Sequence, residues 1–543
     1  MFPRLLLLPF TPRLIVLTLS VAALAGSIHA AHGDWLGWFF IPTLVFAALT
    51  ALGIHDLVQR EHSILRSYPI SAHLRFLLER VRPELRQYFF EDDKDGRPFS
   101  RDQRAVVYQR AKMNIDKRPF GTVHDVYEEG YEWLRHSMMA RPVSKEHFRI
   151  KVGGASCVKP YDISVLNVSA MSFGALSSNA IRALNGGAKK GGFAHDTGEG
   201  GLSPYHEEMG GDIIWEIGSG YFGCRTLAGA FDPEKFAAVA AREQIKMIEV
   251  KMSQGAKPGH GGVLPAAKIS AEIAGIRGVP RGQDCVSPAA HSAFSTPIEF
   301  LRFLAKLREL SGGKPTGFKL CVGQPWEFLA ICKAMVETGL RPDFIVVDGK
   351  EGGTGSAPLE FMDHLGMPMR DGLTFVHHAL IGAGVRDEIR LGVSGKIATS
   401  FDIARAMALG ADWCNSGRAF MFALGCIQSL SCHTDRCPTG VATQDPTRAR
   451  ALVVPDKIER VYNFHKATLM VLAELTAAAG LDHPNDFGPE HFCRRISAHE
   501  VATFAELYPA PRPGAFLDGD IDARFAAAWS RARAEEFRPA PMG

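Results

Sequence analysis

Three of the chain's ten cysteines lie within one short stretch of sequence. Cys426, Cys432 and Cys437 follow the spacing C-x5-C-x4-C, and Pro438 comes directly after the third. A proline after the last cysteine is typical of ferredoxin-type loops, so the spacing favours an iron–sulfur cluster, and three ligands suit a three-iron cluster. Two alternatives stay open. One is a zinc site with His433 as the fourth ligand, although the cysteine spacing does not follow the common C-x2-C pattern of zinc sites. The other is that these cysteines are buried and have only a structural role.

Three turns of small residues offer a place for an anion. Each follows a short apolar run, and such a turn leaves backbone N–H groups free to face a phosphate. In a barrel of alternating strands and helices, the turns after neighbouring strands meet at one face. We therefore predict a shared cradle for the phosphate of an organic cofactor, beside the cysteines. The turns are Gly353-Thr354-Gly355, Ser394-Gly395-Lys396 and Ser416-Gly417-Arg418.

Short apolar runs alternate with amphipathic helices through this whole region. Eight such strand–helix alternations predict an α/β protein with a (β/α)8 TIM barrel. A doubly wound open sheet is the alternative, but no G-x-G-x-x-G follows the first strand. The predicted strands are Ile163–Ser169, Phe193–Asp196, Ile214–Ile217, Met247–Lys251, Gly317–Val322, Phe344–Asp348, Ile389–Val393 and Asp412–Asn415. The predicted helices include Ser177–Lys190, Pro233–Gln244, Pro325–Thr338 and Ser400–Leu409.

Two apolar runs precede the barrel. Leu14–Ala30 and Trp35–Ile54 are each about as long as a bilayer-spanning helix needs, and only Ala31-His32-Gly33-Asp34 separates them. A cleaved signal peptide is the alternative for the first run, and the second run speaks against it. The arginines that flank the pair predict a transmembrane hairpin in the inner membrane, with the catalytic domain facing the cytosol. They are Arg4, Arg13, Arg60, Arg66 and Arg75.

The composition limits the class of protein. A net charge of +3 over 543 residues, without a basic stripe in the catalytic region, gives no support to nucleic-acid binding. Ten cysteines without a disulfide pattern indicate a reducing compartment. The predicted domains are a transmembrane hairpin (1–57), a helical cap or linker segment (58–159), the barrel with its iron–sulfur loop (160–445) and a C-terminal helical extension (446–543).

The stretch G-C-I-Q-S-L-S-C-H-T-D-R-C-P-T-G-V-A-T-Q-D-P closely resembles the cluster loop in the FMN-binding domain of the glutamate synthase large subunit. Further matches follow in the family's order and extend over roughly residues 160 to 480. They are M-S-F-G-A-L-S at Met171, T-G-E-G-G at Thr197, K-M-S-Q-G-A-K-P-G at Lys251 and D-G-K-E-G-G-T-G-S-A-P-L at Asp348. The resemblance implies an FMN oxidoreductase that carries a 3Fe-4S cluster on Cys426, Cys432 and Cys437 and makes glutamate from 2-oxoglutarate and ammonia, through 2-iminoglutarate.

The resemblance also implies roles for single residues. It places Lys251 and Glu199 at the flavin, where Glu199 transfers a proton or handles ammonia, and a cation favours the reduced flavin. Lys257 and Arg277 match positions near the 2-oxoglutarate carboxylates, and an arginine fork suits a carboxylate. The predicted catalytic residues are therefore Lys251, Glu199 and Lys257. The predicted FMN contacts are Met171, Ser172, Phe173 and Lys251 along the ring, and Gly353, Thr354, Gly355, Gly395, Gly417 and Arg418 around the phosphate and ribityl chain.

The chain also departs from the family pattern. It opens with the predicted hairpin in place of a glutaminase domain, and its last hundred residues or so do not resemble the family's β-helix. His260 and Val263 replace a glutamate and a substrate-contacting glutamine, and valine cannot hydrogen-bond the same substrate oxygen. The segment Ser287-Pro288-Ala289-Ala290-His291 likewise differs from the family's S-P-P-P-H-H. The identity of the 2-oxo acid therefore stays open.

Two rival functions follow from these departures. One is an oxidoreductase for a related amine or imine, such as an N-alkylated glutamate, including in the oxidising direction. The other is a non-catalytic electron-transfer subunit of a membrane complex. Because no dinucleotide fingerprint is visible, we expect the electron donor to be ferredoxin, a flavoprotein subunit or a membrane quinone system.

Overall fold

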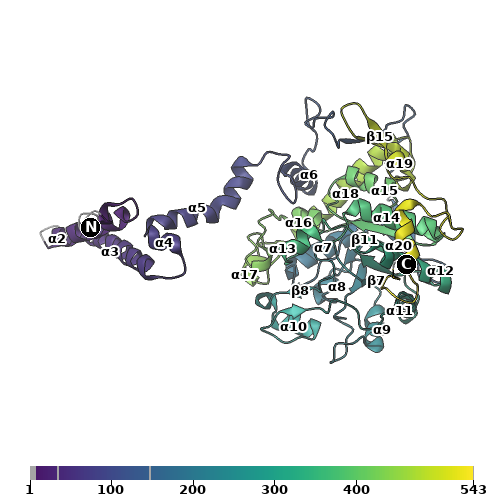
Figure 1. The fold of residues 1–543 in the computed structure, drawn as a ribbon, viewed down its shortest axis with the longest axis horizontal. Coiled ribbons are helices and arrows are strands. Elements are labelled where there is room, and N and C mark those ends of the chain that lie inside the picture. Colours follow the sequence, from purple (N-terminus) through teal and green to yellow (C-terminus); the bar gives the residue numbers. More distant parts are fainter. Residues whose placement is uncertain (1–7, 33–35, 146–147, 542–543) are drawn as a thin grey trace. The chain divides into compact units, whose positions relative to one another are not determined.

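Eight short parallel strands form a closed barrel, which Figure 1 shows encircled by helices. The strands neighbour one another in the order β4-β5-β6-β7-β10-β11-β12-β13, and β13 pairs back onto β4. Closure confirms the predicted (β/α)8 barrel and rules out the open sheet. The strands are β4 (Leu166–Val168), β5 (His195–Asp196), β6 (Ile213–Ile217), β7 (Ile245–Lys251), β10 (Thr316–Leu320), β11 (Phe344–Asp348), β12 (Arg390–Ser394) and β13 (Trp413–Ser416).

The computed structural model describes residues 8–32, 36–145 and 148–541. The chain divides into two compact units, Met1–Ser100 and Arg101–Gly543. The barrel lies in the second unit.

Helices return the chain from each strand to the next, and local capping fixes where they begin. Ser177 accepts a hydrogen bond from the N–H of Ala180 before α7, and Thr399 forms a reciprocal capping box with Asp402 at α15. Gly192 ends α7 with a φ of 63°, a left-handed conformation that favours glycine. The helices around the barrel are α7 (Ser178–Gly191), α8 (Pro204–Glu207), α9 (Pro233–Ala240), α10 (Ala271–Arg277), α11 (Pro297–Leu310), α12 (Pro325–Thr338), α13 (Leu359–His364), α14 (Met369–Gly382), α15 (Ser400–Ala408) and α16 (Arg418–Leu424).

Segments before and after the barrel pack on its helices. The long helix α18 (Val454–Ala478) contacts α6 (Arg101–Ala111), α7, α15 and α16. The region 446–543 contains strands as well as helices: β14 (Phe492–Arg495) pairs with both β15 (Val501–Thr503) and β1 (Glu132–Leu134). The remaining strands and α-helices of this unit are β2 (Arg149–Val152), β3 (Tyr161–Ser164), β8 (Val263–Leu264), β9 (Cys285–Val286), α17 (Pro446–Ala449), α19 (Phe504–Leu507) and α20 (Ala523–Arg531).

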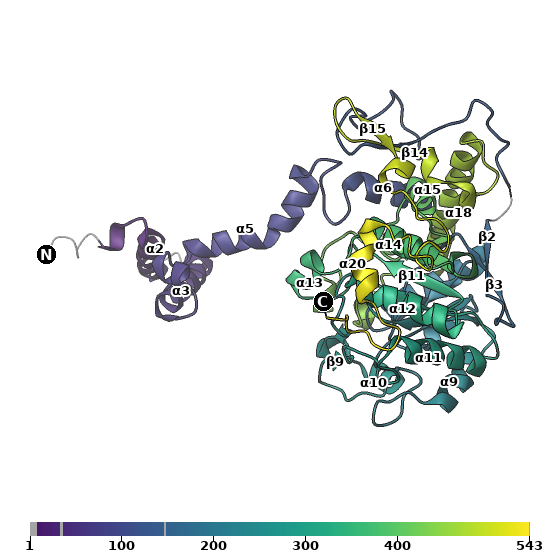
Figure 2. The same cartoon turned by 45° about the vertical axis from the view of Figure 1, so that its right-hand side comes forward.

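A short 3-10 turn (Leu8–Phe10) and then two apolar helices begin the described part of the first unit. α2 (Ile15–Ala31) and α3 (Leu36–Val58) lie side by side in Figures 1 and 2. Within the described residues, the stretch Gly37–Val58 is long and apolar enough to cross a membrane, whereas α2 is shorter. The turn predicted between them falls partly on residues 33–35, which lie outside the described residues. Two further helices follow, α4 (Ser63–Ser67) and α5 (Ser71–Leu85), and a π-helical turn, Arg86–Phe90.

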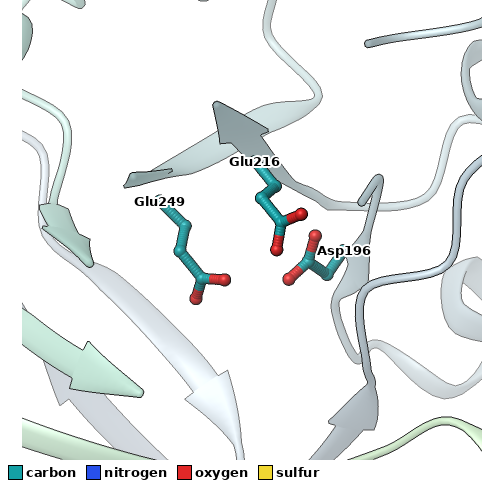
Figure 3. Close-up of side chains that lie close together, drawn as sticks. All are labelled: Asp196, Glu216 and Glu249. Carbon is teal, nitrogen blue, oxygen red and sulfur yellow. The ribbon is translucent and has the colours of Figure 1, made fainter. Parts of the chain in front are cut away.

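Charged side chains fill one layer of the barrel interior. The carboxylates of Asp196, Glu216 and Glu249 point toward one another in Figure 3, with oxygens within 4.8 Å of one another. The ammonium of Lys319 pairs with Glu216 and lies 3.3 Å from Glu249 Oε1. Burial lowers the pKa of Lys319, but the carboxylates of Glu216, Glu249 and Asp196 outweigh it and raise that pKa well above its usual value. The lysine therefore supplies a fixed positive charge within the acidic layer.

We expect Lys319→Met to destabilise the barrel by about 3–5 kcal/mol, because the buried carboxylates lose their cation. The exposed Lys189 of α7 provides a matched control, and Lys189→Met should change the stability by no more than about 0.5 kcal/mol. Urea denaturation of the full chain at neutral pH measures both. Equal midpoints for the two variants would contradict a structural role for Lys319.

Candidate active site

The predicted site residues follow the carboxyl ends of barrel strands, so barrel closure gathers them on one face. Met171, Ser172 and Phe173 follow β4, and Glu199 follows β5. Lys251 is the last residue of β7. Glu249, two residues earlier on the same strand, shares its side of the sheet and belongs to the charged layer of the interior. That layer therefore lies one step below the face that carries the site.

An ion pair occupies the middle of this face. Lys251 Nζ lies 3.1 Å from Glu199 Oε1 and donates to Gln254 Oε1 at 3.0 Å. Burial raises the pKa of Glu199, but Lys251, Arg277 and Lys257 outweigh it and hold that pKa below its usual value. Gly262 is required here, since a Cβ at that position would overlap Glu199 Oε1. Glu199 is therefore held as a carboxylate among cations.

Two further cations, Lys257 and Arg277, lie near this pair. Lys257 is buried and donates to the carbonyl of Ser356 at 3.0 Å. Burial lowers the pKa of Lys257 to about 8. Arg277, the last residue of α10, donates from Nη2 to Ser172 Oγ at 3.4 Å and to the carbonyl of Phe173 at 3.3 Å. Its Nε is buried and has no hydrogen-bond partner in the described part of the chain. The arrangement has more positive than negative groups, which suits an acidic substrate.

The turns after β11, β12 and β13 are neighbours because these strands are neighbours in the sheet. The Arg418 side chain packs against Gly353 and donates to the carbonyl of Glu351. Burial lowers the pKa of Arg418 to about 10, so it remains a cation at neutral pH. Gly417 lies next to Met171, which joins the turn after β13 to the segment after β4.

Free backbone donors line these turns. Gly353 and Gly355 are exposed, whereas Gly395 and Gly417 are half-buried. Among the described residues, none of these four N–H groups has a hydrogen-bond acceptor. Thr354 donates from its hydroxyl to the Ser356 carbonyl at 3.4 Å, the same oxygen that Lys257 contacts. The turns therefore adjoin the group of cations.

The loop with the three cysteines, residues 426–437, follows α16 and has a constrained backbone; it is called the cysteine loop below. Gln428, Leu430 and Asp435 have φ values of 59°, 56° and 62°, in the left-handed region that residues other than glycine rarely adopt. Such strain persists where the surroundings enforce it and is common at functional sites. The structure brings the three predicted ligands together: burial and, to a smaller extent, the nearby Cys432 and Cys437 raise the pKa of the Cys426 thiol to about 12.

Hydrogen-bond donors and a cation surround these thiols. Backbone N–H groups of Thr439, Val441 and Ala442 donate to the Cys437 sulfur and outweigh burial, so the pKa of this thiol is lowered. The buried Lys268 lies near Cys432 and Cys437 and donates to the carbonyl of Ala175 at 3.0 Å. The loop therefore offers three thiols together with groups that stabilise negative charge on sulfur once these thiols lose their protons.

Several residues of this face were not predicted from the sequence. His291 is buried, lies 2.9 Å from the Lys251 carbonyl and 3.1 Å from Tyr221 Oη, and burial lowers its pKa to about 4. A neutral His291 therefore supports the strand end that carries Lys251. Its place in the S-P-A-A-H segment was the available signal. Lys268 and Gln254 carry no pattern that distinguishes them from other polar residues.

The two replaced positions lie on the loops after β7. Val263 begins β8 and pairs with Val286 of β9. The ring of His260 packs edge-on against Phe361, with centroids 5.3 Å apart. Both positions lie outside the ion-pair network of Glu199 and Lys251.

Comparisons with known proteins identify the family. A family model described as a conserved region in glutamate synthase matches residues 133–482. The glutamate synthase large subunit-like protein YerD of Bacillus subtilis is 38% identical over 501 residues, covering 85% of this chain and 94% of that protein. An archaeal glutamate synthase (NADPH) of Methanocaldococcus jannaschii is 34% identical over 353 residues, covering 65% of each chain.

Among solved structures, a flavocytochrome b2 variant with pyruvate bound aligns with a TM-score of 0.41 and 11% identity, covering 86% of this chain and 96% of that one. The barrel assignment rests on the chain's own strand order. The family match spans the whole barrel and the cysteine loop, so this chain belongs to the glutamate synthase family and is a glutamate synthase-like oxidoreductase that acts on CH–NH2 groups.

Proposed function

We propose that this protein is an FMN- and 3Fe-4S-dependent oxidoreductase that forms L-glutamate from 2-oxoglutarate and ammonia. The observation that carries the proposal is the grouping of Lys251, Glu199, Lys257 and Arg277 beside the glycine turns. Family membership supports the reaction class. The chain covers 65% of the archaeal relative's length, so the substrates of that whole protein are proposed here.

The residues present fit FMN. The N–H groups of Gly353, Gly355, Gly395 and Gly417, which have no acceptor within residues 8–32, 36–145 and 148–541, suit a phosphate, and Arg418 adds a permanent cation. We assign Thr354 to the same cradle, and we assign Met171, Ser172, Phe173 and Lys251 to the ring.

The cysteine loop fits an iron–sulfur cluster. Cys426, Cys432 and Cys437 supply three thiolates, and the backbone donors and Lys268 stabilise their charge. When bound, FMN supplies the hydride that reduces an imine carbon, and the cluster supplies electrons.

The chain's own groups then have defined tasks. Lys257 and Arg277 bind the carboxylates of the 2-oxo acid and orient its carbonyl carbon. Glu199 is deprotonated at neutral pH, so its carboxylate can hold ammonium by charge and accept the proton that the nitrogen loses as it attacks the carbonyl carbon. Ammonia adds to the carbonyl carbon, water leaves, and the resulting 2-iminoglutarate is reduced to glutamate. Lys251 Nζ lies 3.1 Å from Glu199 Oε1, and its positive charge stabilises negative charge that develops next to the ammonium group during the reaction.

The pKa of Lys257 predicts how substrate binding depends on pH. Because that pKa is about 8, the ammonium is charged below pH 8 and loses its proton above it. We expect the Kd for 2-oxoglutarate, measured from flavin absorbance without ammonium, to rise up to about tenfold per pH unit above pH 8. Arginine stays charged, so Lys257→Arg should move this rise to higher pH. An identical pH profile in both proteins would contradict the assignment.

We further propose that α3 anchors the protein in the inner membrane, with the second unit in the cytosol. The support is the length and apolar character of Gly37–Val58, together with the exposed side chains of Trp38, Phe40 and Ile41. Ferredoxin, a flavoprotein subunit or a membrane quinone system would supply the electrons. No nucleic-acid partner is proposed.

One experiment separates this function from its rivals. The protein is purified anaerobically in detergent, its visible spectrum and iron content are recorded, and candidate substrates are added. The proposal predicts flavin and iron, with reoxidation of the reduced protein by 2-oxoglutarate plus ammonium. Reoxidation only by other imines, or bleaching of the oxidised flavin by an amine such as an N-alkylated glutamate, would favour the related oxidoreductase. A redox-active flavin that no small molecule oxidises or reduces would favour the electron-transfer subunit.

A further inference from the structure

The helix α5 has an apolar stripe that the described residues of the first unit leave uncovered. Leu74, Leu78, Val81 and Leu85 recur at helical spacing and share one face. Their side chains are 61%, 53%, 37% and 38% exposed. In Figures 1 and 2, α5 extends away from α2 and α3 and does not pack along them. A free stripe of this length on a helix needs a covering surface.

Arginines flank the same stripe. Arg75, Arg82 and Arg86 are spaced by seven and four residues, so they form a line along one side of the helix. They line a shallow hollow together with Leu78, Glu79, Leu85 and Phe90. Of these arginines, Arg75 pairs with Glu79 at 2.9 Å and Arg86 with Glu91 at 3.4 Å. An apolar face bordered by arginines is the pattern of a helix that lies in a membrane interface.

The start of α5 is tied to the end of the apolar helix α3. Asp56 is fully buried near the end of α3, and its carboxylate accepts from the Ile70 N–H at 2.9 Å and contacts His73 Nε2 at 3.0 Å. Ile70 also packs against Gly53 of α3. If α3 crosses a membrane, this junction lies where the span ends, at the boundary between acyl chains and headgroups.

The backbone at this junction is strained. Ile70 has a φ of 64°, which is costly for a β-branched residue. The turn redirects the chain from the hairpin into α5, and the contacts of Asp56 hold it.

We propose that α5 lies in the surface of a membrane leaflet rich in anionic lipid. Leu74, Leu78, Val81 and Leu85 enter the acyl boundary, and Arg75, Arg82 and Arg86 contact lipid phosphates. Beyond α5, Tyr88, Phe89 and Phe90 are exposed and suit the headgroup level, where aromatic side chains are enriched. This inference rests on the proposed membrane attachment through α3.

The test is hydrogen exchange of the full chain in lipid nanodiscs, read by mass spectrometry. One nanodisc contains phosphatidylcholine alone and the other contains phosphatidylglycerol as well. We expect amides of residues 71–85 to exchange about tenfold more slowly in the anionic nanodisc. The variant R75Q/R82Q should remove this difference. The control E79Q/E84Q removes two negative charges from the same helix. In this control the protection should stay the same or increase.

The other outcomes overturn the inference in distinguishable ways. Fast exchange of residues 71–85 in both nanodiscs would show that no membrane covers α5. If residues 71–85 exchange equally slowly in both nanodiscs and in both variants, the stripe is covered by protein, either a second copy or the unit 101–543. The amides of 37–58 report separately on membrane attachment. If they exchange rapidly in both nanodiscs, the attachment through α3 fails, and the inference fails with it.

Discussion

Cys432→Ser is expected to abolish iron binding and to stop turnover with any donor whose electrons enter through the cluster. Loss of one of three ligands should reduce activity by more than the roughly 10–100-fold that loss of a supporting contact costs. FMN should stay bound, because the glycine turns lie on other loops. Iron analysis and electron paramagnetic resonance of the oxidised protein measure the loss.

Cys157→Ser provides the matched control. Cys157 lies outside the cysteine loop, and its thiol donates to the carbonyl of Gly313 at 3.3 Å, a bond that a serine hydroxyl can also make. The control should keep its iron and its activity. A Cys432→Ser protein with unchanged iron content would show that the loop does not bind the cluster.

Lys251→Met is expected to lower kcat by about 10²–10³-fold, the loss that follows when one preorganised charge is removed from a reacting centre. The substitution also leaves Glu199 without its nearest cation, 3.1 Å away, so the pKa of Glu199 should rise. The substitution should therefore lower kcat and shift the acidic limb of the pH profile of kcat to higher pH. The KM for 2-oxoglutarate should change less.

Lys251→Arg keeps the charge and should recover part of kcat. Both variants must retain bound flavin, which the visible spectrum reports. Equal kcat values for Lys251→Met and the unaltered protein, with an unchanged pH profile, would remove Lys251 from the mechanism.

The barrel could be predicted from the sequence because its strands are buried on both faces. Runs such as that of β11 read as continuous β-branched and apolar residues, and glycine or polar residues mark where each strand ends. Each predicted strand overlaps an observed one, with bounds that differ by a few residues at most. The glycine turns could be located for the same reason.

Other features depend on contacts between distant parts of the chain. Lys268 meets the cysteine loop, and Lys319 meets carboxylates from other strands, only when the barrel is closed. The local sequence around each lysine does not indicate which distant residues it will contact. The strands β14 and β15 were expected within a helical extension, and β14 pairs with β1, more than 350 residues earlier in the chain. Long-range pairing of short strands leaves little local signal.

The most direct test of the account is a single turnover without oxygen. The fully reduced protein is mixed with 2-oxoglutarate and isotopically labelled ammonium, and flavin absorbance and labelled glutamate are followed together. The account predicts that the flavin is reoxidised in step with the appearance of labelled glutamate, and that each substrate alone leaves it reduced. A flavin that stays reduced with both substrates, while flavin and iron are fully present, would contradict the proposed reaction.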